Sequence, residues 1–451
     1  MRDIVFLLAF AALFILAIKR PYISLSLWLW SGLFVPVYWL HGIAQSISYN
    51  TVFAACTIIG YLIYRNKSRV PPNALLVLPL LFLAHTTLTS IVTIGIEPYV
   101  WLSWENFLKV MLLFLFASLI LRQKHQFELF IWVIVLSVGF IGFVEGLKFL
   151  ASGGGHSIKG PRGHILSDNN HFALALCMTL PLIIYLITVT PKKFLKIGLI
   201  GVLILCTLAV LGTHSRGGFI GLAVVGSYFW LKSHKKLLSL LLVVIIGTLA
   251  IQFLPESWYE RMDSVESVEK VLEDDSFNTR LNAWKIHTLM AIERPLVGGG
   301  FGTPQYGYVW RSLAVDIHIF DFIPTPPPSE RGWAAHSIYF QVLGDHGFPG
   351  LLLFLLILLI TFRRLSHIEK YYNERDQKQG WQYTLARMIK VSIFVYCIGG
   401  AALSLAYIEL LYALVAITYG LYVSIETSQE QETRARRGNR LKGDRDVMAH
   451  R

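Results

Sequence analysis

The sequence has few charged residues for its length. Of its 451 residues, 15% are charged and 55% are hydrophobic, whereas a soluble domain carries about 25% charged residues. The charges are clustered, and the apolar stretches between them run for roughly 15 to 25 residues, close to the length that a helix needs to cross a bilayer. Backbone in lipid must satisfy its own hydrogen bonds. The composition therefore excludes an ordinary soluble protein and predicts an all-α polytopic membrane protein.

Cysteine is also scarce, and the few residues present indicate no special chemistry. The chain has four cysteines, and all of them fall inside apolar runs. Their spacing indicates neither a metal site nor a disulfide framework, so we expect small core side chains. They are Cys56, Cys177, Cys206 and Cys397.

Several familiar motifs are missing. The outer loops contain no His-x-x-x-His or Asp-x-Asp spacing, which argues against a metal centre, and the chain has no Gly-x-Ser-x-Gly, which argues against a serine hydrolase. We expect neither a metal nor a cofactor. The first apolar run is followed by Lys19 and Arg20 without a small-residue cleavage site, so we expect it to be kept as a signal anchor.

Basic residues lie in short segments between the apolar runs. The formal net charge of +12 would suit a nucleic-acid partner, but this distribution is the one expected from the positive-inside rule. We therefore expect no nucleic-acid partner and assign these segments to the cytoplasm. They are Lys19–Arg20, Arg65–Arg69, Arg122–Lys124, Lys192–Lys196, Lys232–Lys236, Arg363–Arg364 and the tail RARRGNRLKGDR.

The apolar runs predict twelve or thirteen transmembrane helices. Several runs are short, so some could be tilted, half-inserted or merged with a neighbour. Alternation of the spans places one long loop, between the late spans, on the side of the membrane opposite the cytoplasm. The candidate spans are 4–18, 22–43, 51–64, 73–94, 105–121, 127–149, 171–189, 195–212, 217–232, 237–254, 336–362, 386–402 and 405–424.

This pattern divides the chain into five parts. Alternation also puts the 151–170 loop, the corner GTHSRGG and the long loop on one side of the membrane. Within the long loop, apolar residues recur at helical spacing and predict a helix over 277–292. The parts are N-terminal transmembrane helices 1–150, central helices 151–254 with a periplasmic loop at 151–170, a large and partly helical periplasmic loop 255–335, C-terminal transmembrane helices 336–425, and a disordered basic cytoplasmic tail 426–451.

Two arginines are candidates for binding an anion. Arg216 stands at the edge of a span, where an arginine is costly unless it faces a polar cavity or an anionic partner. Arg280 lies in the predicted loop helix, with Trp284 one turn later. Snorkelling or solvation would explain either arginine alone, but together they could clamp a phosphate, because guanidinium groups bind it bidentately. Further positive charge is expected from Lys159, Arg162 and His164 in the glycine-rich loop.

His336 stands where a polar loop meets the apolar run LLLFLLILLITF. An imidazole has a pKa of about 6.5, which suits it to accept a proton near neutrality. The alternative is a structural histidine at the membrane edge. Asp345 follows nine residues later, a separation that does not place it beside His336 on a helix, so no Asp–His pair is predicted.

The segments that carry these residues resemble the bacterial O-antigen ligase and polymerase superfamily. They are GTHSRGGFIGL, NTRLNAWKIHTLMAIERPLVGGGFGT, HSIYFQVLGDHGFPGLLLFLL and, upstream, SDNNHFALALCMTLPL with Asn170. The N-terminal half looks closest to the O-glycosylation ligases that accompany bacterial exosortase systems. Two departures stand out: the acidic residue before the late glycine is often Glu in the family and is Asp345 here, and the glycine-rich loop has no counterpart.

The resemblance implies a C-type glycosyltransferase membrane fold, with the active site on the periplasmic side of the inner membrane. It also implies metal-independent, inverting transfer of a glycan from a polyprenyl-diphosphate carrier to a lipid or protein acceptor, such as the lipid A core. By position, Arg216 and Arg280 match the diphosphate-binding arginines, and His336 matches the essential histidine. We add Asn170 and Trp284 to the expected substrate-binding residues.

Two other functions remain open at this point. A repeat-unit polymerase would use similar chemistry with a second lipid-linked glycan as acceptor, and the sequence does not separate it from a ligase. A transporter of an anionic lipid or sugar would place its charges near the middle of the membrane. Here Glu409 is the one clear mid-span acid near the C-terminus, and the polar residues gather in outer loops.

Overall fold

The chain folds into helices. The computed structural model describes residues 2–65, 67–68, 70–233, 235–237, 275–378 and 380–449, and over these residues it contains no strand, so the all-α prediction is confirmed. The α-helices are α1 (Arg2–Lys19), α2 (Pro21–Leu33), α3 (Tyr49–Ile63), α4 (Ala74–Ile91), α5 (Glu97–Ile120), α6 (Lys124–Ala151), α7 (Asn169–Val189), α8 (Lys193–Gly212), α9 (Arg216–Lys232), α13 (Asp275–Glu293), α14 (Gly307–Ala314), α15 (Ile338–Glu374), α16 (Trp381–Gly399) and α17 (Glu409–Ala449). Short 3-10 helices are η1 (Pro36–Tyr38), η2 (Gly42–Ala44), η3 (Thr303–Gln305), η4 (Ile317–Phe320) and η5 (Gly400–Ala402).

Many of these helices have the length and composition of membrane spans. Among the described residues, eight helices qualify, namely α4, α5, α6, α7, α8, α15, α16 and α17, and two shorter apolar helices lie in α1 and α3. The protein is therefore a multi-pass membrane protein, as predicted. The count of twelve or thirteen spans stays a prediction, because α1, α2, α3 and α9 are not among the eight and residues 238–254 lie outside the described residues.

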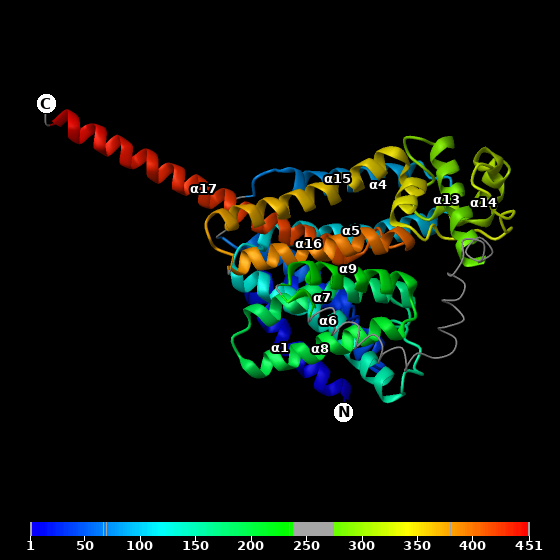
Figure 1. Cartoon of the computed structure of the whole chain (residues 1–451), viewed down its shortest axis with the longest axis horizontal. Helices are drawn as coiled ribbons and strands as arrows, with labels where there is room; N and C mark the ends of the chain where they lie inside the picture. Colours follow the sequence, from blue (N-terminus) through cyan, green and yellow to red (C-terminus); the bar gives the residue numbers. More distant parts are fainter. Residues whose placement is uncertain are drawn as a thin grey trace.

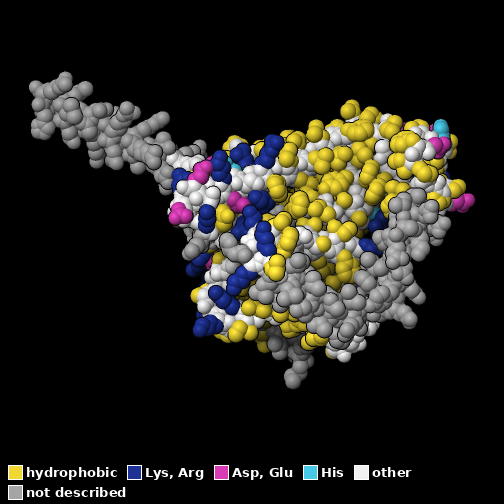
Figure 2. Space-filling view, in the orientation of Figure 1, with side chains coloured by type: hydrophobic (Ala, Val, Ile, Leu, Met, Phe, Trp, Pro, Cys, Tyr) yellow, Lys and Arg dark blue, Asp and Glu magenta, His cyan; other side chains and the backbone are white. Residues whose placement is uncertain are grey.

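The helical bundle has two chemically different ends. Figure 1 shows α4, α5, α15 and α16 running along the long axis, with α13 and α14 at one end and α17 leaving at the other. In Figure 2 hydrophobic side chains cover much of the face between the ends, and Lys and Arg gather where α17 leaves. We call that end, which holds the α1–α2, α5–α6 and α7–α8 connections, the basic end, and the end that holds α13 the site end.

Loops from distant parts of the sequence meet at the site end. The Asn169 side chain donates to the carbonyl of Thr213 at 2.8 Å, joining the α6–α7 loop to the α8–α9 corner. The backbone N–H of Ile94 donates to the carbonyl of Gly299 at 3.3 Å, joining the α4–α5 connection to the segment after α13. Gly163 of the α6–α7 loop and Phe301 of the segment after α13 line one cavity, so the described parts of the three outer segments share one end.

The predicted span over 22–43 is wrong in its second half. Helix α2 ends at Leu33, and Val35 takes a left-handed conformation with φ of 47°. Pro36 follows, and its ring disfavours helical backbone in the residue before it. The chain then passes through η1 and η2 before α3 begins.

Two other predictions concern the loop and the tail. The helix predicted over 277–292 is confirmed by α13, whereas most of the predicted span 237–254, and residues 255–274 of the loop, lie outside the described residues. Helix α17 extends to Ala449 in the structure, and the predicted disorder of the tail stays a prediction. The segment after Ile425 contains no proline and is rich in Glu, Gln, Arg and Ala, which are good helix formers.

Glycines let α6 and α8 pack closely. A Cβ atom at Gly146 would overlap the backbone carbonyl of Leu205, and one at Gly142 would lie 2.8 Å from the sulfur of Cys206. By contrast, a Cβ at Gly201 of α8 would meet nothing within 4 Å. The close approach of the two helices therefore depends on Gly146, whereas Gly201 is open.

Replacing Gly146 should destabilise this contact. We expect Gly146→Ala to cost about 1–3 kcal/mol, because an added methyl overpacks a site walled by rigid backbone. The matched change Gly201→Ala should be neutral or stabilising, since alanine favours helix by about 1 kcal/mol over glycine. Thermal unfolding of both purified variants in detergent tests this, and equal midpoints would contradict the packing account.

Candidate functional site

The α8–α9 corner positions Arg216 at the start of a helix. Ser215 caps α9 by accepting a hydrogen bond from the N–H of Gly218 at 3.1 Å. A Cβ at Gly218 would lie 2.8 Å from the Cβ of Ala173, so α9 begins in close contact with α7. The Arg216 side chain is exposed at this point. The corner therefore presents a guanidinium group at the site end.

The start of α7 lies beside this corner. Asp168 caps α7 by accepting from the N–H groups of Asn170 and His171, at 2.9 and 3.2 Å. Asn169, which donates to Thr213, is the residue that joins α7 to the corner. Asn170, which the sequence favoured, is one position away, and its amide donates to the side chain of Asn169 at 3.3 Å. Nothing in the sequence distinguishes Asn169 from its neighbour.

Helix α13 carries Arg280 and is fixed to the start of α15 by Trp284. The indole N–H of Trp284 donates to the carbonyl of Ala335 at 2.9 Å, and its ring stacks on Phe340 with centroids 5.1 Å apart. Ala335 and Phe340 lie on either side of His336 in the sequence. By contacting both, Trp284 positions the segment that carries His336. Its predicted role in binding substrate stays a prediction.

His287 fills the contact between α13 and α15. It is 2% exposed, and its Nδ1 donates to the carbonyl of Ala283 at 2.8 Å. A Cβ at Gly344 would lie 2.6 Å from the His287 ring. Burial lowers the pKa of His287 to about 4, so the ring is neutral near pH 7. This histidine is a packing residue that the sequence analysis did not single out.

His336 lies where these elements converge. Its backbone has a left-handed φ of 46° and its N–H donates to the hydroxyl of Ser404 at 2.8 Å. A left-handed conformation is uncommon for a residue other than glycine, and such strain is often found at functional sites. The backbone at half-buried His336 is therefore fixed by Ser404 of the α16–α17 connection and, through the neighbouring Ala335, by Trp284 of α13.

The electrostatic surroundings of His336 show which groups share its site. Burial lowers the pKa of His336 below its usual value, Arg280 and His171 lower it further, and the Asp168 carboxylate opposes them. Arg280 thus lies within electrostatic reach of His336, although 56 residues separate them. The net effect keeps the imidazole neutral near pH 7, which is the form that accepts a proton.

The basic residues of the glycine-rich loop have a different place. His164 is a structural residue: its Nε2 donates to the carbonyl of Gly32 at 3.0 Å, its Nδ1 accepts from the N–H of Leu166, and burial lowers its pKa. Lys159 and Arg162 are exposed. Within the described residues, no hydrogen bond or ion pair joins these two cations to His336 or to the arginines, so their role in binding stays a prediction.

A cavity of about 650 Å³ adjoins this loop. It lies between α2, α3, α5 and the start of α17, and His164, Phe301, Tyr407 and Glu409 are among its lining residues. Glu409, which the sequence placed in mid-span, begins α17 and packs against Gly32. The cavity therefore offers room for part of a substrate near the α16–α17 connection.

Asp345 holds the segment after α13 against α15. Its carboxylate accepts from the N–H of Gly302 and from the hydroxyl of Tyr407, each at 2.9 Å. The backbone N–H groups of Gly299 and Gly300 donate to the carbonyls of Gly344 and Asp345, at 3.0 and 2.8 Å. These bonds give Asp345 and the glycine-rich segment after α13 a structural role, because they join that segment to α15. Among the described residues, the hydrogen-bond partners of the Asp345 carboxylate are thus Gly302 and Tyr407, and no Asp–His pair was predicted.

Metal ligands do not cluster near these residues. In the part of the chain that the structure describes, no group of three or more His, Cys, Asp or Glu side chains is placed to hold a metal ion.

Comparison with known families divides the chain in two. Residues 1–190 match a family of unknown function (DUF5935), and residues 201–355 match the O-antigen ligase family. The second match contains Arg216, Arg280 and His336, and it agrees with the resemblance seen in the sequence. The closer likeness to exosortase-associated ligases stays a prediction. No curated protein matches the chain.

Removing the Asp345 carboxylate should destabilise the fold. We expect Asp345→Ala to cost about 2–4 kcal/mol, because it leaves the half-buried Gly302 N–H and Tyr407 hydroxyl without their acceptor. Asp345→Asn keeps one acceptor and should cost less. Thermal unfolding in detergent distinguishes them. If Asp345→Ala unfolds like wild type yet abolishes activity, the residue acts in the chemistry and the structural account is wrong.

Proposed function

We propose that this chain, which belongs to the O-antigen ligase and polymerase superfamily, transfers a glycan from a polyprenyl-diphosphate carrier to an acceptor hydroxyl. The transfer takes place at the periplasmic face of the bacterial inner membrane. The observation that carries the proposal is the convergence at the site end of a neutral, half-buried His336 with Arg280. The α8–α9 corner brings Arg216 to the same end.

The distribution of charge supports the periplasmic orientation. Lys and Arg gather at the basic end, opposite α13. Basic segments favour the cytoplasm, so the site end faces the periplasm. Arg216 and Arg280 then stand on the side where positive charge is disfavoured, which supports a role in binding an anion.

The arginines bind the diphosphate of the donor. Guanidinium groups stay charged and bind phosphate oxygens through paired hydrogen bonds. As the bond between the anomeric carbon and the diphosphate oxygen breaks, its electron pair passes to the diphosphate. Arg216 and Arg280 stabilise this negative charge, which is greater in the transition state than in the bound donor.

His336 accepts the proton of the acceptor hydroxyl. The hydroxyl oxygen forms the new bond to the anomeric carbon from the side opposite the leaving diphosphate, so the configuration is inverted. Arg280 has a second effect here, because its charge disfavours the imidazolium and keeps His336 ready to accept a proton. Asn170 and Trp284 complete the substrate-binding residues, and the cavity near Glu409 has room for part of the acceptor.

The acceptor distinguishes a ligase from a polymerase. We favour a ligase that uses the lipid A core or a similar lipid or protein acceptor. A polymerase would lengthen the purified lipid-linked donor when no other acceptor is present, whereas a ligase needs the second substrate.

Loss of the His336 imidazole should stop transfer. In a strain that lacks the gene, we expect complementation with His336→Ala to reduce transfer by about 10²–10⁴-fold and to cause lipid-linked donor to accumulate. His318→Ala is the matched control. His318 lies in η4, in the same connection between α13 and α15 as His336, and it is exposed. Transfer is measured by gel analysis of the glycan, and blotting checks membrane levels. Wild-type transfer by His336→Ala would refute its role as base.

The pH dependence should report the environment of His336. Because the pKa of His336 is lowered in the free protein, its ring stays neutral until the pH falls below about 6.5, and the acid limb of kcat/KM, which reports the free enzyme, should lie below that value. Asp168→Asn keeps the α7 cap, since Asn caps as well as Asp, but removes the charge that raises this pKa. The limb should then move to lower pH. A shift to higher pH, or a wild-type limb above 6.5, would contradict the assignment.

A further inference from the structure

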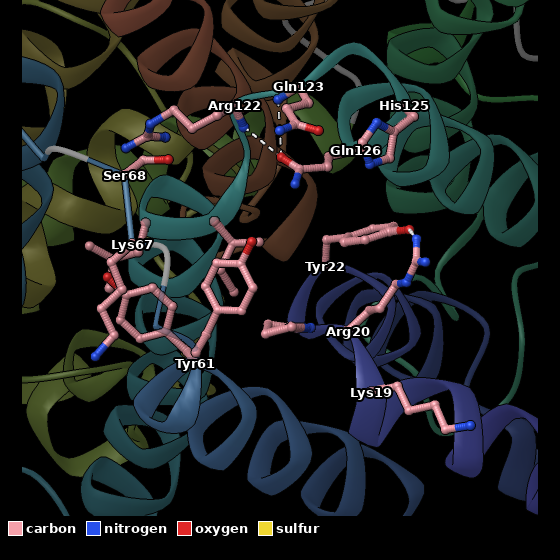
Figure 3. Close-up of a pocket in the computed structure, with 14 residues that line it drawn as sticks. Lys19, Arg20, Tyr22, Tyr61, Lys67, Ser68, Arg122, Gln123, His125 and Gln126 are labelled. Atoms are coloured by element: carbon pink, nitrogen blue, oxygen red, sulfur yellow. Dashed lines mark hydrogen bonds between the residues drawn. The ribbon is translucent and has the colours of Figure 1, made fainter.

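The basic end contains a pocket that the proposed glycan transfer does not use. It encloses about 510 Å³ between the α1–α2, α3–α4 and α5–α6 connections. Figure 3 shows Tyr22 with Arg20 on one side, Tyr61 and Lys67 on the other, and the α5–α6 connection above them. His336, Arg216 and Arg280 lie at the site end, opposite this pocket, so the pocket is a separate site.

The pocket gathers positive charge, and no acidic side chain of the described residues lines it. Lys19, Arg20, Lys67 and Arg122 are among its lining residues. Cations held together in this way repel one another. A cleft lined by charge of one sign attracts ions of the other sign, so this pocket favours an anion.

Arg122 has hydrogen-bonding groups that an anion would satisfy. Its Nη1 donates to the carbonyl of Leu121 at 2.7 Å and its guanidinium carbon lies 5.3 Å from the centroid of the Tyr419 ring, but its buried Nε and Nη2 lack a hydrogen-bond acceptor among the described residues. A buried charged donor without an acceptor is costly. In Figure 3 the guanidinium group lies beside Ser68 at the margin of the pocket. Turning it towards the pocket would give both N–H groups a phosphate oxygen as acceptor.

Arg20 and Lys67 have more N–H donors than the side-chain hydrogen bonds that they make. Arg20 donates from Nη1 to the hydroxyl of Tyr22 at 3.1 Å, and Lys67 donates to the carbonyl of Leu62 at 3.3 Å. A guanidinium group has five N–H donors and an ammonium group three, so each of these side chains has further donors for a ligand.

The remaining walls suit a molecule that is apolar at one end. Pro21, Leu119 and Ile120 supply apolar surface, and Tyr22, Tyr61 and Tyr64 supply rings with hydroxyl groups. Tyrosine is enriched at the level of lipid headgroups, because it has an apolar body and a polar tip. A lipid with a phosphate headgroup would use both kinds of surface, whereas a free phosphate ion would use one.

We propose that this pocket binds the phosphate-bearing headgroup of an anionic phospholipid in the cytoplasmic leaflet. The cations contact the phosphate, and the apolar wall contacts the start of the acyl chains. Basic pockets between transmembrane helices on the cytoplasmic side are suited to such headgroups. The site would tie the first three helices to α5 and α6 through a bound lipid.

Native mass spectrometry of the purified full-length protein tests the proposal. The probes are phosphatidylglycerol, phosphatidylcholine and inorganic phosphate, each titrated in detergent. We expect one tightly held phosphatidylglycerol, about tenfold weaker binding in Arg20→Gln/Lys67→Gln and in Arg122→Gln, and little binding of phosphatidylcholine. The first variant changes only exposed side chains, so it keeps the test valid if Arg122→Gln fails to fold.

The matched control is Lys192→Gln/Lys193→Gln. It removes the same charge from exposed residues at the same end, outside the pocket, and should change phosphatidylglycerol binding by less than about twofold. If the control weakens binding as much as the pocket variants do, general surface charge holds the lipid and the proposal fails. Equal binding of phosphatidylcholine also overturns it. Competition by millimolar inorganic phosphate would identify a soluble anion as the ligand and overturn the assignment to a lipid.

Discussion

The arrangement of the site end depends on the hydrogen bonds that pair the free backbone groups at the break in α15. Gly347 takes a left-handed φ of 67°, which interrupts the helix and frees backbone groups from their usual partners. At membrane depth such groups must be paired within the protein. The segment after α13 supplies the partners, since Gly299 and Gly300 donate to carbonyls before the break and Phe348 donates to the carbonyl of Pro295. This pairing fixes α13 against α15 and so brings Arg280 towards His336.

At this site, charged groups of both signs act on the pKa of His336. Arg280 and His171 disfavour protonation of His336, and Asp168 opposes them. A second buried histidine, His287, is kept neutral by burial between α13 and α15. Positive charge therefore comes from guanidinium groups, which stay charged, while the imidazole stays neutral. This division suits a reaction in which an anion departs and a proton is accepted at the same centre.

The choice of Arg216, Arg280 and His336 as site residues stays a prediction, whereas the sequence predicted the helical class, helix α13 and a common side for the outer loops that meet at the site end. These depend on hydropathy, charge and helical periodicity, which are local or repeat regularly. It did not predict the end of α2 at Leu33, because Pro36 was read as part of an apolar run. It missed Asn169 and His287, whose roles follow from contacts with distant residues. It also treated His164 as a source of charge, whereas its bond to Gly32, 132 residues away, makes it structural.

The central claim is that this site breaks the bond between a glycan and a diphosphate carrier. The most direct measurement uses purified protein in vesicles with a polyprenyl-diphosphate-linked glycan and an acceptor, and quantifies the freed carrier and the glycosylated acceptor together. We predict one molecule of polyprenyl diphosphate released for each glycan transferred, with an inverted anomeric configuration in the product. Transfer without release of the diphosphate carrier, or a product with retained configuration, would contradict the account.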